Sequence, residues 1–173
     1  MIKNKNIIYY LIAMALFVLL KFGYTIADTN DLNFLLQPTN KLVEILTGLQ
    51  SIYSIENGYY YAQLNIVINK SCSGFNFWLL CFLMLTFLSV NYFNKTIHKV
   101  SAFVFCFIAA YLLTIFVNSS RIFASIVLLN PSISTFHIKQ PIIHESIGIL
   151  TNLVFLILIY LIAEKILQKY QFN

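Results

Sequence analysis

Four long apolar runs constrain this chain more than any other feature. They cover about residues 7–26, 73–92, 100–118 and 146–163. A helix that crosses the hydrocarbon core of a bilayer needs about 20 apolar residues, and each run has close to that length. Lipid offers no hydrogen bonds to a backbone, so a single segment that crosses it must be helical. The sequence therefore predicts an all-α polytopic membrane protein with about four transmembrane helices.

The composition agrees with a membrane protein and argues against one that binds nucleic acid. Of the 173 residues, 60% are hydrophobic and only 10% are charged, which is far more apolar than an average soluble domain. The net charge of +5 comes from lysines that flank the apolar runs and form no basic stripe. We therefore expect a lipid bilayer, and no nucleic acid, as the surroundings of this chain.

The placement of the lysines predicts the topology. With the N-terminus inside, four crossings leave six lysines on the inner side, as the positive-inside rule requires: Lys3, Lys5, Lys95, Lys99, Lys165 and Lys169. We expect both termini to be cytoplasmic and the loop 27–71 to lie outside. The first run is longer than the core of a signal peptide and has no A-x-A-like site after it, which favours an anchor. Residues 1–173 are expected to form one integral membrane domain.

The apolar segment 121–130 is too short to cross a bilayer. Nine residues, RIFASIVLL, precede Asn130-Pro131, and at about 1.5 Å per residue they reach about half of the hydrocarbon core. A fifth crossing would also place the C-terminal lysines outside. We therefore expect a half-helix that is either re-entrant or interfacial.

The outer loop 27–71 is long enough to have structure of its own. PTNKLVEILTGL predicts an amphipathic helix on the membrane surface, with Thr39 or Asn40 as its N-cap. SIYSI and YYYAQLNIVI then flank Glu56-Asn57-Gly58, which predicts a β-hairpin around an Asn-Gly turn. These elements form a small extracytoplasmic insertion.

Three reactive side chains are expected at the outer ends of the spans. Cys72 begins the second span, where the positive end of a helix dipole favours a thiolate. Arg121 follows the third span and is the single arginine in a chain with ten lysines, which favours a role for its fork of donors. His144 precedes the fourth span and is suited to accept the thiol proton and to return it to a leaving amine.

Four further residues are candidates for supporting roles. Ser71 is expected to cap the helix that Cys72 begins, and Gly74 leaves room beside the sulfur for a substrate backbone. Asn118 lies one turn before Arg121 and is expected to orient it or to donate a further hydrogen bond. His137 lies in the same outer loop as His144, and the sequence alone does not rank the two histidines by distance.

Each candidate also has a purely structural interpretation. A lone cysteine is usually a small buried hydrophobe, an arginine at a membrane boundary is usually an anchor, and a histidine there can cap a helix. A catalytic role is favoured only because the cysteine, the arginine and the histidine are all expected at the outer ends of the spans. Cys81 and Cys106 lie inside apolar runs and are expected to be packing residues. Neither a metal site nor a cofactor is expected, because no HExxH or CxxC pattern is present.

Three short motifs, each at the edge of an apolar run, resemble the exosortase/archaeosortase family. They are CSG at 72–74, N-x-x-R at 118–121 and H-x-x-x-G at 144–148. The resemblance covers about residues 35–163, and the short chain is similar to compact members such as exosortase K.

The resemblance implies a membrane cysteine protease or transpeptidase in the bacterial cytoplasmic membrane, with its active site at the extracytoplasmic face. It implies Cys72 as nucleophile, Arg121 as stabilising cation and His144 as acid and base. The implied partners are membrane-anchored precursor proteins that end in a sorting signal, which consists of a short motif, a transmembrane helix and a basic tail. A thioester on Cys72 would pass to an amine acceptor, on a lipid or a glycan, or to water.

The main alternative is a non-enzymatic polytopic subunit of an envelope export or polysaccharide assembly system, which needs no thiol. A transporter or channel is less favoured, because polar residues in the apolar runs are mostly Ser, Thr, Asn and Cys.

Overall fold

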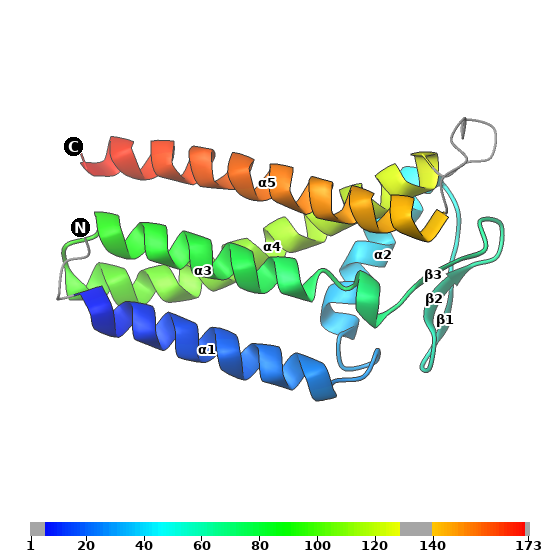
Figure 1. The fold of residues 1–173 in the computed structure, drawn as a ribbon, viewed down its shortest axis with the longest axis horizontal. Coiled ribbons are helices and arrows are strands. Elements are labelled where there is room, and N and C mark those ends of the chain that lie inside the picture. The colour runs from blue at the N-terminus through cyan, green and yellow to red at the C-terminus, as the bar shows by residue number, and fades with distance from the viewer. Residues whose placement is uncertain (1–5, 129–139, 172–173) are drawn as a thin grey trace. The chain divides into compact units, whose positions relative to one another are not determined.

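Helices make up most of the structure, which is a computed structural model that describes the backbone of residues 6–128 and 140–171. The α-helices in the described part are α1 (Ile7–Ile26), α2 (Asn33–Thr47), α3 (Phe75–Tyr92), α4 (Thr96–Leu128) and α5 (Gln140–Gln171) (Figure 1). Between α2 and α3 lie the strands β1 (Ile52–Ser54), β2 (Gly58–Tyr61) and β3 (Ile66–Ile68), followed by the 3₁₀ turn η2 (Lys70–Cys72).

Four of the described segments are long and apolar enough to cross a membrane, which confirms the polytopic all-α fold. They are Ile7–Ile26, Lys70–Tyr92, Thr96–Val127 and Ser146–Lys169. On α1, large side chains such as Leu11, Leu19 and Phe22 are more than 60% exposed. An apolar surface of this extent is stable against lipid and not against water. The chain is a multi-pass membrane protein.

The chain divides into two compact units, which are described separately. The first unit comprises Met1–Ile26, Phe75–Thr114 and Leu156–Asn173. In it α1 and α3 lie side by side and run in opposite directions (Figure 1). Aromatic rings of α3 and α4 form much of its interior: the Trp78 ring lies 4.7 Å from that of Phe107, and its indole N–H donates to the Phe107 carbonyl at 3.3 Å.

The second unit comprises Ala27–Gly74 and Ile115–Phe155, and in it the hydroxyls of Tyr59 and Tyr61 of β2 donate to Asn33 and Asn40 of α2. Leu35, Leu36 and Val43 of α2 are fully buried, and so is Tyr61 of β2. The helix begins at Asn33, five residues before Pro38, and no side chain caps its N-terminus. The expected cap at Thr39 or Asn40 was therefore wrong.

Buried polar residues on the inner face of α2 explain that error. Asn40 accepts a hydrogen bond from the Tyr61 hydroxyl at 2.8 Å and donates to Ser51 at 2.8 Å. The Glu44 carboxylate accepts from the Ser51 hydroxyl at 2.6 Å and from the Ser51 backbone N–H at 3.0 Å. These bonds, the Ser51 hydroxyl first, lower the pKa of Glu44, while burial raises the pKa of Tyr61 to about 12. The polar residues tie α2 to the sheet instead of starting the helix.

The sheet is antiparallel with the strand order β1-β2-β3, so the expected hairpin is present and a third strand extends it. In the register Ser54 pairs with Gly58, and Tyr61 pairs with Ile66. Gly58 has φ +86°, and a Cβ built on it would lie 2.3 Å from the Ile68 carbonyl oxygen. Glycine is therefore required at the first residue of β2.

The half-helix expected at 121–130 differs in the structure, because residues 121–128 continue α4 without a break. The Ser119 and Ser120 hydroxyls donate to carbonyls one turn earlier, at 2.7 and 2.9 Å, so the polar N-S-S-R stretch fits inside a helix. The 32-residue candidate span Thr96–Val127 is about 48 Å long at 1.5 Å per residue. This exceeds a hydrocarbon core of about 30 Å, so α4 extends beyond the lipid on at least one side. Its depth in the bilayer stays a prediction.

Candidate functional site

Cys72 lies in a tight turn immediately before α3. The turn η2 is capped by Asn69, whose side-chain oxygen accepts from the Ser71 backbone N–H at 3.1 Å and from the Ser71 hydroxyl at 2.8 Å. Gly74 then adopts φ +72°, and α3 starts at Phe75. The expectation that Cys72 occupies the first turn of the helix with Ser71 as N-cap was therefore wrong.

This geometry gives different roles to two predicted supporting residues. Gly74 is needed because a left-handed residue connects the 3₁₀ turn to α3, a conformation that costs other residues about 1 kcal/mol or more. Ser71 is exposed, and its hydroxyl lies 3.8 Å from the Cys72 sulfur. The Cys72 side chain itself is half-buried. The sulfur thus lies at the end of a turn with a defined backbone and is only partly covered.

Asn118 connects the Cys72 turn to α4. Its side-chain amide donates to the Cys72 backbone carbonyl at 2.5 Å, and the residue is only 2% exposed. We expected Asn118 either to orient Arg121 or to donate a further hydrogen bond, and its amide donates one to the Cys72 carbonyl. The residue therefore positions the backbone that carries the thiol.

Arg121 brings a half-buried positive charge to the same region. Its guanidinium is close enough to the Cys72 sulfur to interact with it electrostatically. A Cβ built on Gly148 of α5 would lie 3.6 Å from both Cδ and Nη1 of Arg121. The arginine therefore lies along α5 at the one position of the H-x-x-x-G motif that has no side chain. Sulfur, guanidinium and α5 meet within the second unit.

His144 precedes Gly148 by one turn of α5, so the two positions share a face of that helix. The backbone thus places position 144 next to the turn that Arg121 contacts. The His144 side chain lies outside what the structure describes, and its approach to Cys72 stays a prediction. His137 also lies outside the described residues.

Three buried polar atoms of the described part have no hydrogen-bond partner around this site: Oδ1 of Asn118, Nε of Arg121 and Oγ1 of Thr39. A buried polar group without a partner costs about 1–3 kcal/mol, so such groups usually have a ligand or a function. Two of the three belong to residues that the sequence had selected. Unpartnered polar atoms of this kind are expected in a site that forms hydrogen bonds with a substrate.

Sequence reasoning missed Thr39, Asn69 and Ser119. The Thr39 carbonyl lies 3.2 Å from the Ser119 hydroxyl, which places α2 against α4 beside Asn118. Thr39 is also fully buried. The role of Asn69 could have been predicted from the sequence, because an Asn side chain often accepts from the backbone N–H two residues later and forms an Asx turn. Thr39 and Ser119 show none, because their contact joins segments 80 residues apart.

Cys81 and Cys106 are buried in the first unit, as expected of packing residues. The Cys106 sulfur lies 3.4 Å from the Ser89 hydroxyl. Both thiols are thus shielded from any reagent that reaches Cys72. They provide internal controls for experiments on that residue.

Comparison of the chain with protein-family models, with curated proteins and with solved structures found no match.

Proposed function

We propose that this protein is a membrane cysteine protease or transpeptidase of the exosortase type. It cleaves the C-terminal sorting signal of exported precursor proteins through a thioester on Cys72. The proposal combines the motif resemblance with the neighbourhood of Cys72, Asn118 and Arg121. A membrane-embedded enzyme suits a substrate whose own signal includes a transmembrane helix.

The first chemical step forms the acyl-enzyme. His144 accepts the Cys72 proton, and the sulfur attacks the carbonyl carbon of the scissile peptide bond. Arg121 stabilises the negative charge that develops on the carbonyl oxygen, an effect that is stronger for a group partly withdrawn from water, as its buried Nε is. The C–N bond then breaks, and the leaving amine takes the proton from His144. The released fragment is the transmembrane tail.

The second step releases the product. An acceptor amine or water attacks the thioester carbonyl, His144 removes the proton of the attacking group, the C–S bond breaks, and the Cys72 thiolate leaves and takes that proton from His144. An amine on a lipid or a glycan gives transpeptidation, whereas water gives hydrolysis. Exclusion of water from the Cys72 turn would favour the amine.

The single observation that carries the proposal is that α4 brings two of the selected residues to Cys72: the Asn118 amide donates to the Cys72 carbonyl at 2.5 Å, and Arg121 one turn later is close enough to interact electrostatically with the sulfur. A structural anchor would place its guanidinium against carboxylates, carbonyls or lipid headgroups at a surface. Here a half-buried arginine instead lies near a nucleophile, and its buried Nε has no partner in the described part of the chain. The arrangement is suited to bind a group that arrives with the substrate.

The experiment that tests the proposal is trapping of the acyl-enzyme. Membranes that contain the protein are mixed with a candidate precursor that ends in motif, transmembrane helix and basic tail, and adducts are located by mass spectrometry. We expect an adduct on Cys72 whose mass equals the precursor without its tail. Cys72→Ala should abolish it and should let the uncleaved precursor accumulate. Cys106→Ala should leave both unchanged, because that thiol is buried.

The same experiment separates the enzyme from the non-enzymatic alternative. A subunit of an export or assembly system would tolerate Cys72→Ala with normal precursor processing and would form no adduct. An adduct on Cys81 or Cys106 in place of Cys72 would also contradict the assignment.

A further inference from the structure

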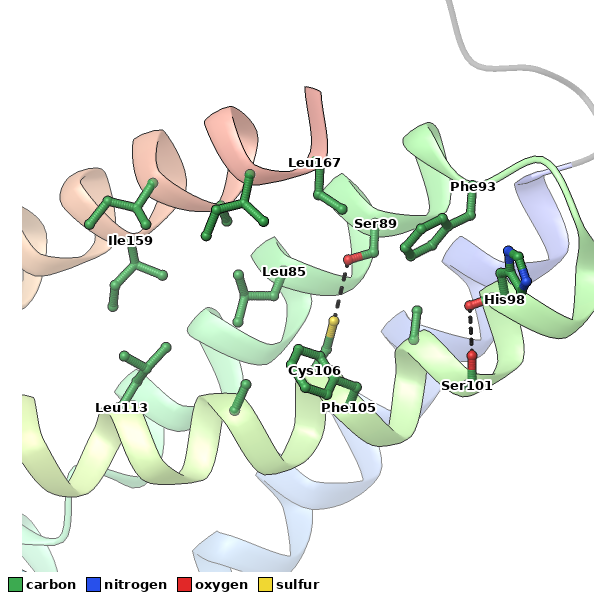
Figure 2. A pocket seen from close by; sticks show the side chains of 15 residues that line it. Leu85, Ser89, Phe93, His98, Ser101, Phe105, Cys106, Leu113, Ile159 and Leu167 are labelled. Carbon is green, nitrogen blue, oxygen red and sulfur yellow. Dashed lines mark hydrogen bonds between the residues drawn. The ribbon is translucent and has the colours of Figure 1, made fainter. Parts of the chain in front are cut away.

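A large apolar cavity lies in the first unit, between α3, the first half of α4 and the second half of α5. Its volume is about 770 Å³, within the range of about 300–1,000 Å³ that is typical of small-molecule sites. Figure 2 shows Leu113 and Ile159 toward one end, and Phe93, His98 and Leu167 toward the other. None of Cys72, Asn118 and Arg121 lines it. The cavity is therefore separate from the candidate catalytic residues.

The two ends of the cavity differ in chemistry. The end with Leu113 is apolar, whereas His98 is an exposed residue at the other end. At that end the Gln168 side chain of α5 donates to the Tyr92 hydroxyl of α3 at 3.5 Å, so the ends of the two helices are joined. An amphipathic ligand would place its polar group at this end.

Positive charge gathers at the same end. Lys165 directly precedes the lining residue Ile166, Lys169 follows the lining residue Leu167 by two positions, and Lys95 lies three residues before His98. All three lysines are exposed. Lys165 and Lys169 are one turn apart and share a face of α5.

Two other charges near this end are already engaged. Lys99 is buried and donates to the Asn6 side chain, so it has no role at the mouth. The Glu164 carboxylate accepts from the Tyr160 hydroxyl at 3.4 Å. Among the described residues, three exposed lysines and one acidic residue therefore give the His98 end of the cavity a net positive charge.

We propose that this cavity binds one anionic phospholipid, with acyl chain in the apolar interior and phosphate against Lys95, Lys165 and Lys169. Apolar walls exclude a free phosphate, and the lysines distinguish an anionic headgroup from a zwitterionic one. A transmembrane helix with a basic tail is disfavoured, because its positive charges would face the same lysines. The proposal does not depend on the proposed catalytic function.

The test is native mass spectrometry of the purified full-length protein with phosphatidylglycerol or phosphatidylcholine of identical acyl chains. We expect one phosphatidylglycerol per protein, bound at least tenfold more tightly than phosphatidylcholine. Each lysine near a lipid surface contributes about fivefold, so the triple variant Lys95→Gln, Lys165→Gln, Lys169→Gln should weaken binding on the order of 100-fold. Lys41→Gln, at an exposed position of α2, is the matched control and should change nothing.

A second variant tests the cavity itself. Ala109 lines it, and Ala109→Phe should fill it and remove the bound phosphatidylglycerol with all lysines in place. Equal binding of the two lipids, or binding that survives both Ala109→Phe and the triple lysine variant, would show only a non-specific lipid shell and would overturn the proposal.

Discussion

Replacement of Asn118 by valine should separate the stability of this protein from its activity. The change removes the 2.5 Å hydrogen bond to the Cys72 carbonyl, which is worth about 1 kcal/mol net. It also removes the buried Oδ1, which has no partner in the described part of the chain and costs about 1–3 kcal/mol. The two terms oppose each other, so we expect the free energy of unfolding to change by no more than about 2 kcal/mol.

The activity should respond far more strongly. Without the amide, the turn that carries Cys72 is no longer connected to α4, and a displacement of about 1 Å at a nucleophile costs about 100-fold in rate. The assay compares the rate of adduct formation on Cys72 in membranes with the thermal unfolding midpoint in detergent. Thr114→Val is the matched control, because Thr114 is equally buried on the same helix and its hydroxyl bonds only to the Ala110 carbonyl one turn earlier.

Two results would refute this reasoning. Full activity of Asn118→Val would show that the hydrogen bond does not position the thiol. A loss of several kcal/mol of stability, in parallel with the loss of activity, would show that Asn118 is a structural residue of the second unit.

Three further substitutions test other parts of the account. Arg121→Lys keeps the charge but loses the planar fork, so adduct formation on Cys72 should fall at least tenfold at unchanged protein levels in the membrane; equal rates would contradict a specific role for arginine. The pKa of Glu44 is lowered by its hydrogen bonds, so its stabilising effect is complete above its ordinary pKa and is lost as pH falls through the lowered value. Glu44→Gln should therefore reduce the unfolding midpoint at pH 7 and should differ little from wild type near pH 3. A difference in midpoint that stays constant over this range would contradict the predicted direction of the pH dependence. Gly58→Ala should destabilise the protein by about 3 kcal/mol, because the new Cβ would lie 2.3 Å from a carbonyl oxygen. Gly48→Ala, with φ +70° and open space around it, should cost only about 1 kcal/mol, and equal losses would show that the contact at position 58 is relieved.

Sequence reasoning predicted the spans because their signal is local. Runs of about 20 apolar residues identify a helix in lipid without knowledge of its neighbours. The hairpin was predictable for the same reason, since Asn57-Gly58 marks a turn locally, although the turn is residues 55–57 and Gly58 already belongs to β2. The third strand was not, because Asn65 turns the chain with φ +51° inside a run that reads as one continuous strand.

The errors arose where tertiary contacts override local rules. Thr39 and Asn40 are favourable caps by type, yet they are buried in the interior of α2 because Ser119 and Tyr61 are their partners. Residues 118–121 look like the end of a helix, yet serine hydroxyls bonded to carbonyls one turn earlier keep α4 intact. The site residues were found through short motifs and because Arg121 is the single arginine in a chain with ten lysines. Their contacts, such as that of Asn118 with Cys72, could not be predicted because they join segments 46 residues apart.

The most direct test of the central claim is chemical cross-linking between Cys72 and position 144. In the variant His144→Cys, a short bifunctional thiol reagent should link residues 72 and 144, and the product should be detected as a cross-linked peptide. The control is Ser146→Cys, because position 146 lies about 200° around α5 from position 144. We predict an efficient link to residue 144 and little to residue 146. A link to residue 146 in preference to 144, or none to either with reactive thiols, would contradict the convergence of Cys72, Arg121 and His144.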